Sequence, residues 1–89
     1  MDQTPTKIPD RFVDTEIDDE VVVMRLSDGD MFSLVGTSRE IWNCIDGQRT
    51  VAAIVADLAG KHQAPRETVA ADVARFVEEL RDAELVEIR

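Results

Sequence analysis

The segment Val21–Val35, VVVMRLSDGDMFSLV, decides the fold because it predicts a β-hairpin. Two runs rich in β-branched and other apolar residues flank Asp28-Gly29, a dipeptide typical of a two-residue hairpin turn. Such a turn would place Leu26 opposite Met31 and would set the register of the whole hairpin. One face would then carry Val21, Val23, Phe32 and Leu34, and the other would carry Val22, Met24, Leu26, Met31 and Val35.

Both faces of this hairpin are apolar, whereas a small antiparallel sheet usually buries one face and exposes the other. We also expect one of its strands to lie at the edge of the sheet, with unpaired backbone groups. A second apolar surface beside such an edge suits the capture of an extended peptide, which would add to the sheet as a further strand.

Outward from the hairpin, the pattern predicts one strand before it and three helices after it. Residues 12–17 alternate weakly, and residues 18–20 form an acidic turn. Apolar residues then recur at helical spacing in three stretches, at residues 37–46, 50–60 and 65–83. Thr37 or Ser38 is expected to cap the first helix, and Thr50 is expected to cap the second. This order predicts an α+β fold, in which a three-stranded antiparallel sheet is followed by three helices.

The 89 residues predict one domain at 12–89, preceded by a flexible N-terminal arm at 1–11. The arm is polar and contains two prolines. Residues 85–88 could extend briefly against the core. Val, Ile, Leu and Phe make up 25 of the 89 residues, enough for a small core.

The formal net charge of −9 argues against partners with a negative surface, such as nucleic acid or an anionic membrane. It favours solubility and a partner with basic residues. Cys44 is the single cysteine, so an internal disulfide is impossible. The first residues lack the apolar core of a signal peptide, and no apolar run approaches the length of a membrane span. We therefore expect a cytoplasmic protein.

Two segments of the chain are similar to a known family. The first combines DMFSL (residues 30–34), IWNCIDG (41–47) and RTV (49–51). The second combines ADVARFVEEL (71–80) with LV (85–86). Together they resemble the PqqD-like family, also called the RiPP recognition element, over residues 12–88. Among its members, the chain looks most like the free-standing B1 proteins of lasso-peptide biosynthesis.

The resemblance implies a winged-helix-like fold and a binding function without catalysis. Members bind the leader segment of a ribosomally made precursor peptide and present it to a separate modifying enzyme or leader peptidase. The leader adds beside the third strand and packs against the third helix, here residues 30–35 and 66–83. The implied peptide-binding residues are Asp30, Met31, Phe32, Ser33, Leu34, Val35, Val69, Asp72, Val73, Arg75, Phe76 and Glu79. A peptide chaperone of pyrroloquinoline quinone biosynthesis and a winged-helix DNA-binding regulator are the alternatives.

Simpler interpretations stand beside these. The apolar hairpin residues could belong to the core alone, and Arg75 could pair with Glu79 on a solvated helix flank. Trp42 and Cys44 are interpreted as core residues and His62 as a solvent-facing residue at a helix end. The acidic residues of the two turns lack the spacing of a calcium loop. We expect no cofactor, metal or catalytic residue, and a monomer or weak dimer.

Overall fold

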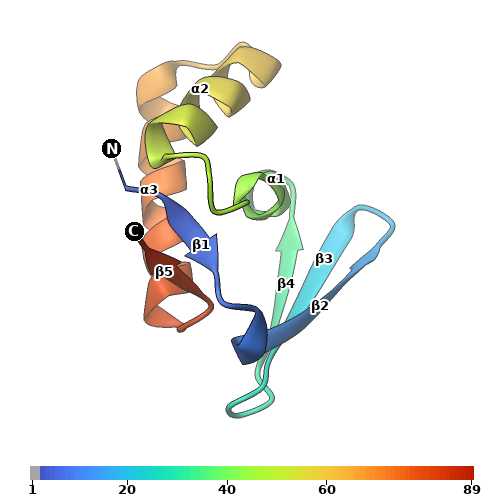
Figure 1. Ribbon diagram of the computed structural model, residues 1–89. Coiled ribbons are helices and arrows are strands. Elements are labelled where there is room, and N and C mark those ends of the chain that lie inside the picture. The colour runs from blue at the N-terminus through green and yellow to red at the C-terminus, as the bar shows by residue number, and fades with distance from the viewer. Residues whose placement is uncertain (1–2) are drawn as a thin grey trace.

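The computed structural model describes residues 3–89 and places a three-stranded antiparallel sheet beside a layer of helices (Figure 1). The sheet has the order β2 (Phe12–Ile17), β3 (Glu20–Arg25) and β4 (Met31–Val35). Three helices follow it: α1 (Thr37–Cys44), α2 (Val51–His62) and α3 (Arg66–Asp82). The predicted α+β fold is confirmed.

The register of the β3–β4 hairpin differs from the predicted one. Met24, and not Leu26, lies opposite Met31, so the pairing is displaced by two residues and the two-residue turn at Asp28-Gly29 is wrong. The connection is longer because the Arg25 carbonyl oxygen accepts from the amide of Gly29 (2.8 Å), which closes a tight loop before Asp30. A displacement of two residues leaves every side chain on its predicted face.

The inner face of the sheet supplies one wall of the core. Val21, Val23 and Leu34 are buried there, on the one face that their alternation predicted they share. Apolar positions of all three helices complete the core, with Trp42, Ile54 and Val73 among the least exposed side chains. The ring of Trp42 packs edge-on against Phe12, with 5.2 Å between the centroids. The prediction that Trp42 is a core residue is confirmed.

The N-terminal segment departs from the predicted flexible arm. Strand β1 (Pro5–Lys7) pairs antiparallel with β5 (Val86–Ile88), and a 3-10 turn, η1 (Pro9–Arg11), leads into β2. Pro5 is fully buried, and the amide of Ile8 donates to the carbonyl of Leu85 (3.0 Å). Residues 5–11 therefore belong to the folded unit, because backbone pairing with the distant C-terminal strand holds them. Met1 and Asp2 lie outside the described residues.

Local signals account for the helix boundaries. Thr50 caps α2 as predicted, since its hydroxyl oxygen accepts from the amide of Ala53 (3.1 Å). The first helix instead begins after Gly36, whose φ of 58° favours glycine, and neither Thr37 nor Ser38 caps it. Helix α2 ends at His62, two residues beyond the range predicted from Gly60, and Gln63 caps it in the left-handed conformation.

Candidate functional site

Strand β4 is an edge strand with a free row of backbone groups. Its one strand partner among the described residues is β3, because β5 pairs with β1 in a separate sheet. The amide of Arg25 donates to the carbonyl of Asp30 (2.8 Å), and hydrogen-bonded pairs alternate along an antiparallel ladder. Phe32 and Leu34 therefore direct their backbone groups to β3. The amides and carbonyls that point away from the sheet are those of Met31, Ser33 and Val35.

An apolar hollow of about 90 Å³ lies between the inner face of the sheet and α3. The sheet contributes one wall and the last two turns of α3 contribute another, with Leu85 after the helix. Its lining is almost entirely apolar and consists of Val23, Phe32, Leu34, Phe76, Glu79, Leu80, Ala83 and Leu85. The free edge of β4 thus lies beside a cavity that the protein's own side chains leave unfilled.

A larger, polar cleft of about 300 Å³ continues from this hollow between the start of α1 and α3. Phe76 and Glu79 line both spaces, so the two lie next to one another along α3. The remaining lining residues of the cleft are Thr37, Ser38, Ile41, Asp72 and Arg75. We call the hollow and the cleft together the β4–α3 groove. It is apolar at the Ala83 end and polar at the Asp72 end.

The predicted ion pair of Arg75 with Glu79 is not formed. Arg75 Nη2 instead lies 3.3 Å from Oδ1 of Asp72, one turn earlier on α3. Both side chains are well exposed, so this pair contributes little to stability. Its position at the polar end of the groove leaves the carboxylate of Glu79 without an ion-pair partner among residues 3–89.

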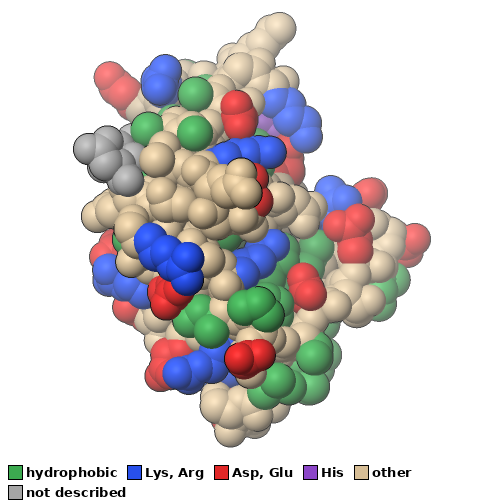
Figure 2. All heavy atoms as spheres, viewed as in Figure 1, with side chains coloured by type: hydrophobic (Ala, Val, Ile, Leu, Met, Phe, Trp, Pro, Cys, Tyr) green, Lys and Arg blue, Asp and Glu red, His purple; other side chains and the backbone are tan. Residues whose placement is uncertain are grey.

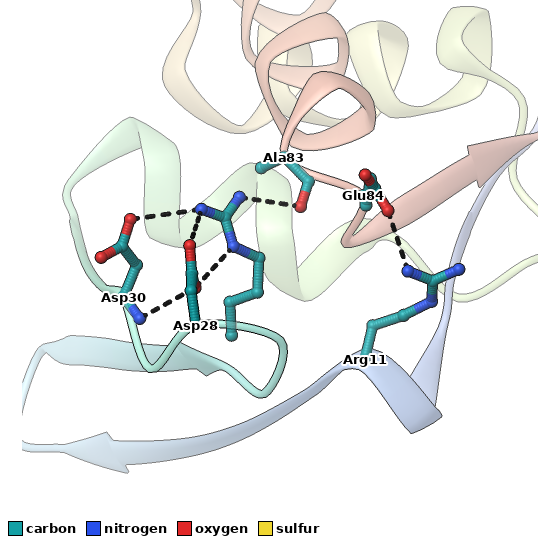
Figure 3. A network of polar contacts seen from close by, with 6 residues as sticks. Arg11, Asp28, Asp30, Ala83 and Glu84 are labelled. Atoms are coloured by element: carbon teal, nitrogen blue, oxygen red, sulfur yellow. Dashed lines mark hydrogen bonds and ion pairs between the residues drawn. The ribbon is translucent and has the colours of Figure 1, made fainter.

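A polar network anchors the β3–β4 turn to the end of α3 (Figure 3). The guanidinium of Arg25 donates to the carbonyl oxygen of Ala83 (3.1 Å), and it also pairs with Asp28 (2.6 Å) and Asp30 (3.2 Å). The hydrogen bond from Arg25 lowers the pKa of Asp28 to about 2. Arg25 lies 5.5 Å from the centroid of the Phe32 ring, so the same side chain borders the apolar end of the groove.

Comparisons with known proteins place this fold and groove in a family. The sequence profile described as "Coenzyme PQQ synthesis protein D (PqqD)" matches residues 20–86. The chain belongs to the PqqD family. A solved structure described as "TbiB1 in Complex with the TbiA(beta) Leader Peptide" is similar to it, with a TM-score of 0.82 and 33% sequence identity. That similarity covers 92% of this chain and 95% of the other. A comparison with curated proteins finds no match.

The PqqD-like resemblance and the winged-helix-like fold expected from it are therefore confirmed. Half of the twelve residues that the resemblance implied as peptide-binding line the groove of this PqqD-family domain, and three more form the strand edge beside it. Phe32, Leu34, Phe76 and Glu79 line the hollow, and Asp72 and Arg75 line the cleft. Met31, Ser33 and Val35 form the free edge.

Three of the implied residues lie elsewhere. Asp30 precedes β4 and belongs to the turn, where its carboxylate faces Arg25. Val69 and Val73 are buried in the core, and neither lines the hollow or the cleft. They belong to the same buried core cluster as Leu58 and Ile54.

The groove also contains residues that the sequence pattern missed. Leu80 and Ala83 follow Phe76 at helical spacing, a signal that could have identified this face of α3. Val23, Leu85 and the anchoring residue Arg25 come from other parts of the chain, and no spacing rule connects them to α3.

Outside the groove, the side chains with the greatest potential reactivity are those of Cys44 and His62. Burial raises the pKa of the half-buried Cys44 thiol, which makes it a poor nucleophile. His62 is exposed at the end of α2, as predicted, and its Nε2 lies 2.7 Å from Glu40. Residues 3–89 contain no cluster of side chains suited to a metal ion. No helix in that range is long and apolar enough to cross a membrane.

Proposed function

We propose that this protein binds the leader segment of a ribosomally synthesised precursor peptide and presents it to a separate processing enzyme. The observation that carries the proposal is the free edge of β4 beside an unfilled apolar hollow. Strand addition draws affinity from backbone hydrogen bonds and specificity from pockets for alternate side chains. Both components are present here within a single groove.

The geometry defines how the leader would bind. Its backbone would pair with the outward amides and carbonyls of Met31, Ser33 and Val35. Every second leader side chain would then point into the groove. The hollow has a volume of about 90 Å³, roughly that of three liquid water molecules. This volume suits one branched aliphatic side chain as the anchor of the leader.

The polar end of the groove sets a second requirement on the leader. Asp72, Arg75 and Glu79 present two carboxylates and one guanidinium within the cleft. A leader residue two or more positions from the aliphatic anchor would meet these groups, and a hydrogen-bonding or basic side chain would satisfy Glu79. The net charge of −9 also favours the approach of a basic peptide.

Two comparisons bear on the pathway that we propose. The described complex of TbiB1 with a leader peptide supports a role in leader recognition. We place this chain with the B1 proteins of lasso-peptide biosynthesis, acting without catalysis beside a leader peptidase in the cytoplasm. The family description supports a second candidate, a peptide chaperone for the precursor of pyrroloquinoline quinone. A third, DNA binding, is disfavoured by the acidic charge and would require tight binding in a mobility-shift assay at low salt.

Titration with synthetic leaders tests the proposal. We expect the cognate leader to shift backbone NMR signals of residues 31–35 and of the groove face of α3, with little change in β2. A precursor leader of the pyrroloquinoline quinone pathway serves as the comparison, and the tighter binder identifies the pathway. Spectra that do not respond to the leader of the precursor encoded beside this chain would overturn the assignment.

A further inference from the structure

The outer face of the three-stranded sheet, on the side opposite the hollow, is an exposed apolar surface. Its largest exposed side chains are 50–66% accessible and come from β2, β4 and the turn before β4: Val13, Ile17, Leu26, Met31 and Val35. The half-buried Val22 and Met24 of β3 lie between them. Figure 2 shows hydrophobic side chains gathered over the lower right of the molecule, where Figure 1 places the sheet.

The strand register makes these residues one continuous patch. Val13, Met24 and Met31 lie directly opposite one another across the three strands. At the other end, Ile17 and Val35 flank Glu20. We call this surface, from the Val13 row to the Ile17 row, the outer face. Opposed apolar side chains on neighbouring strands form a flat platform that can pack against a partner.

Acidic residues lie at the Ile17 end of this apolar surface. Asp18 and Asp19 form the β2–β3 turn, and neither has an ion-pair partner among the described residues. Figure 2 shows acidic side chains at this end, on the right of the molecule. Two copies of the chain, each with a net charge of −9, would repel one another if their outer faces met. The charge therefore favours a different protein, whose apolar contact surface is bordered by Lys and Arg.

The outer face is continuous with the proposed leader strand, which connects the two surfaces. Leader residues opposite Met31, Ser33 and Val35 would project their side chains onto the same side of the sheet as the outer face. Three strands of five residues cover roughly 250 Å², and a fourth strand adds about one third. The free face is thus small compared with the ~800 Å² per partner of a stable interface. The added strand enlarges it.

We propose that the outer face docks the processing enzyme, and that the bound leader completes this docking surface. The inference rests on the proposed function, since the partner is the enzyme that removes or modifies the leader. It predicts that the enzyme binds the leader-loaded domain more tightly than the free domain. By thermodynamic linkage, the enzyme raises the affinity of the domain for the leader by the same factor.

The test uses two double variants with the same change in charge. Val13→Lys with Ile17→Lys places two cations on the outer face, at the strand farthest from β4. Ala56→Lys with Ala74→Lys places two cations at exposed helical positions away from both surfaces. Each protein is titrated with the fluorescently labelled cognate leader and, separately, with the purified leader peptidase of the same precursor. Circular dichroism confirms that the variants fold.

We expect both variants to bind the leader within twofold of the wild type. The outer-face variant should bind the peptidase at least tenfold more weakly, and the helical variant should not change. Equal peptidase affinity in the two variants would overturn the inference. A dimer in sedimentation that the outer-face variant dissociates would also overturn it, because a second copy would then be the occupant. Failure of the wild type to bind the leader would instead refute the proposed function, while peptidase binding to the leader-free domain still reports on the outer face.

Discussion

The two edges of one small sheet have opposite properties, although both expose unpaired backbone groups. Strand β2 carries Asp14 and Glu16 at its inward positions, where Asp14 accepts from the indole of Trp42 (3.1 Å) and Glu16 pairs with Arg39 (3.1 Å). Strand β4 carries Phe32 and Leu34 at the corresponding positions, beside an apolar hollow. Inward-pointing charges are a known protection of an edge against pairing. The comparison shows that side chains, and not the backbone, decide which edge can accept a peptide.

Helix α3 adds to this difference. It supplies the second wall of the groove beside β4, through Phe76 and Leu80. No cavity among those described joins β2 to a helix in the same way. A peptide on β2 would therefore gain backbone hydrogen bonds without burying apolar side chains. Backbone hydrogen bonds alone contribute modestly in water, because the unbound groups are already hydrated.

The largest effect should follow from a charge in the hollow. Phe76 lines both parts of the groove and is partly accessible. We expect Phe76→Glu to weaken leader binding by about 100-fold or more, since central aromatic residues commonly dominate an interface. Phe76→Leu keeps an apolar wall and should cost much less. Fluorescence anisotropy with labelled leader measures both variants. A Phe76→Glu protein that folds and binds as the wild type does would place the peptide elsewhere.

Proline substitutions compare the two edges directly. The amides of Ser33 on β4 and Glu16 on β2 both point away from the sheet, so a proline at either position removes no internal ladder bond. We expect Ser33→Pro to weaken leader binding about tenfold or more, through the lost donor and the bulk of the ring. Glu16→Pro should leave the affinity unchanged. Calorimetric titration of the two proteins, with Ser33→Ala as a control for the contact between Ser33 and Glu20, distinguishes the edges.

A smaller effect is expected at the anchor of the turn. Arg25→Lys retains the charge but loses the planar donor group that contacts Ala83 and both aspartates together. The turn before β4 should then move more freely against α3. We expect leader affinity to fall by about threefold, in keeping with partly exposed ion pairs. Surface plasmon resonance should show the loss mainly as faster dissociation. A change of 30-fold or more would mean that Arg25 contacts the peptide itself.

The smallest effect concerns acid stability. The pKa of Asp28 is lowered from its usual 3.8 to about 2 in the folded protein, so folding favours its ionised form. The resulting stabilisation is present above pH 4 and is lost as the pH falls from about 4 to 2. Asp28→Asn lacks this contribution at every pH. We expect urea unfolding to show a small difference between the two proteins at pH 6 that vanishes near pH 2. If the difference in the free energy of unfolding between the two proteins were the same at every pH, Asp28 would not be the cause of this pH dependence.

The sequence predicted the faces of the hairpin better than its turn. Alternation placed Val21, Val23 and Leu34 on the same face, and that grouping holds because a register displaced by two residues leaves each side chain on its face. It did not show which of the two apolar faces is buried. The Asp28-Gly29 signal indicated a turn but not its length, which depends on the contacts of Arg25 with Asp28 and Asp30. Arg25 also donates to the carbonyl oxygen of Ala83 at the end of α3, a tertiary contact that a local sequence pattern cannot show.

The groove was even harder to predict from the sequence than the turn, because its walls come from distant parts of the chain. Phe32 and Phe76 are 44 residues apart, and only the folded chain brings them to one hollow. The strands β1 and β5 have three residues each, which is too short to show a period, and β1 begins with a proline. Periodicity placed Val69 and Val73 on the apolar side of α3, but it could not distinguish the core from the groove. The sequence also could not show which strand at the edge of the sheet would accept a peptide, because strand order depends on the tertiary structure.

Amide hydrogen exchange tests the central claim most directly, because it reports on individual backbone groups of both edges. In the free protein, the amides of Met31, Ser33 and Val35 should exchange rapidly, as should those of Asp14 and Glu16. Saturation with the cognate leader should protect the three β4 amides strongly and leave the two β2 amides unchanged. Protection on β2, or β4 amides that still exchange rapidly in the saturated complex, would contradict strand addition at β4.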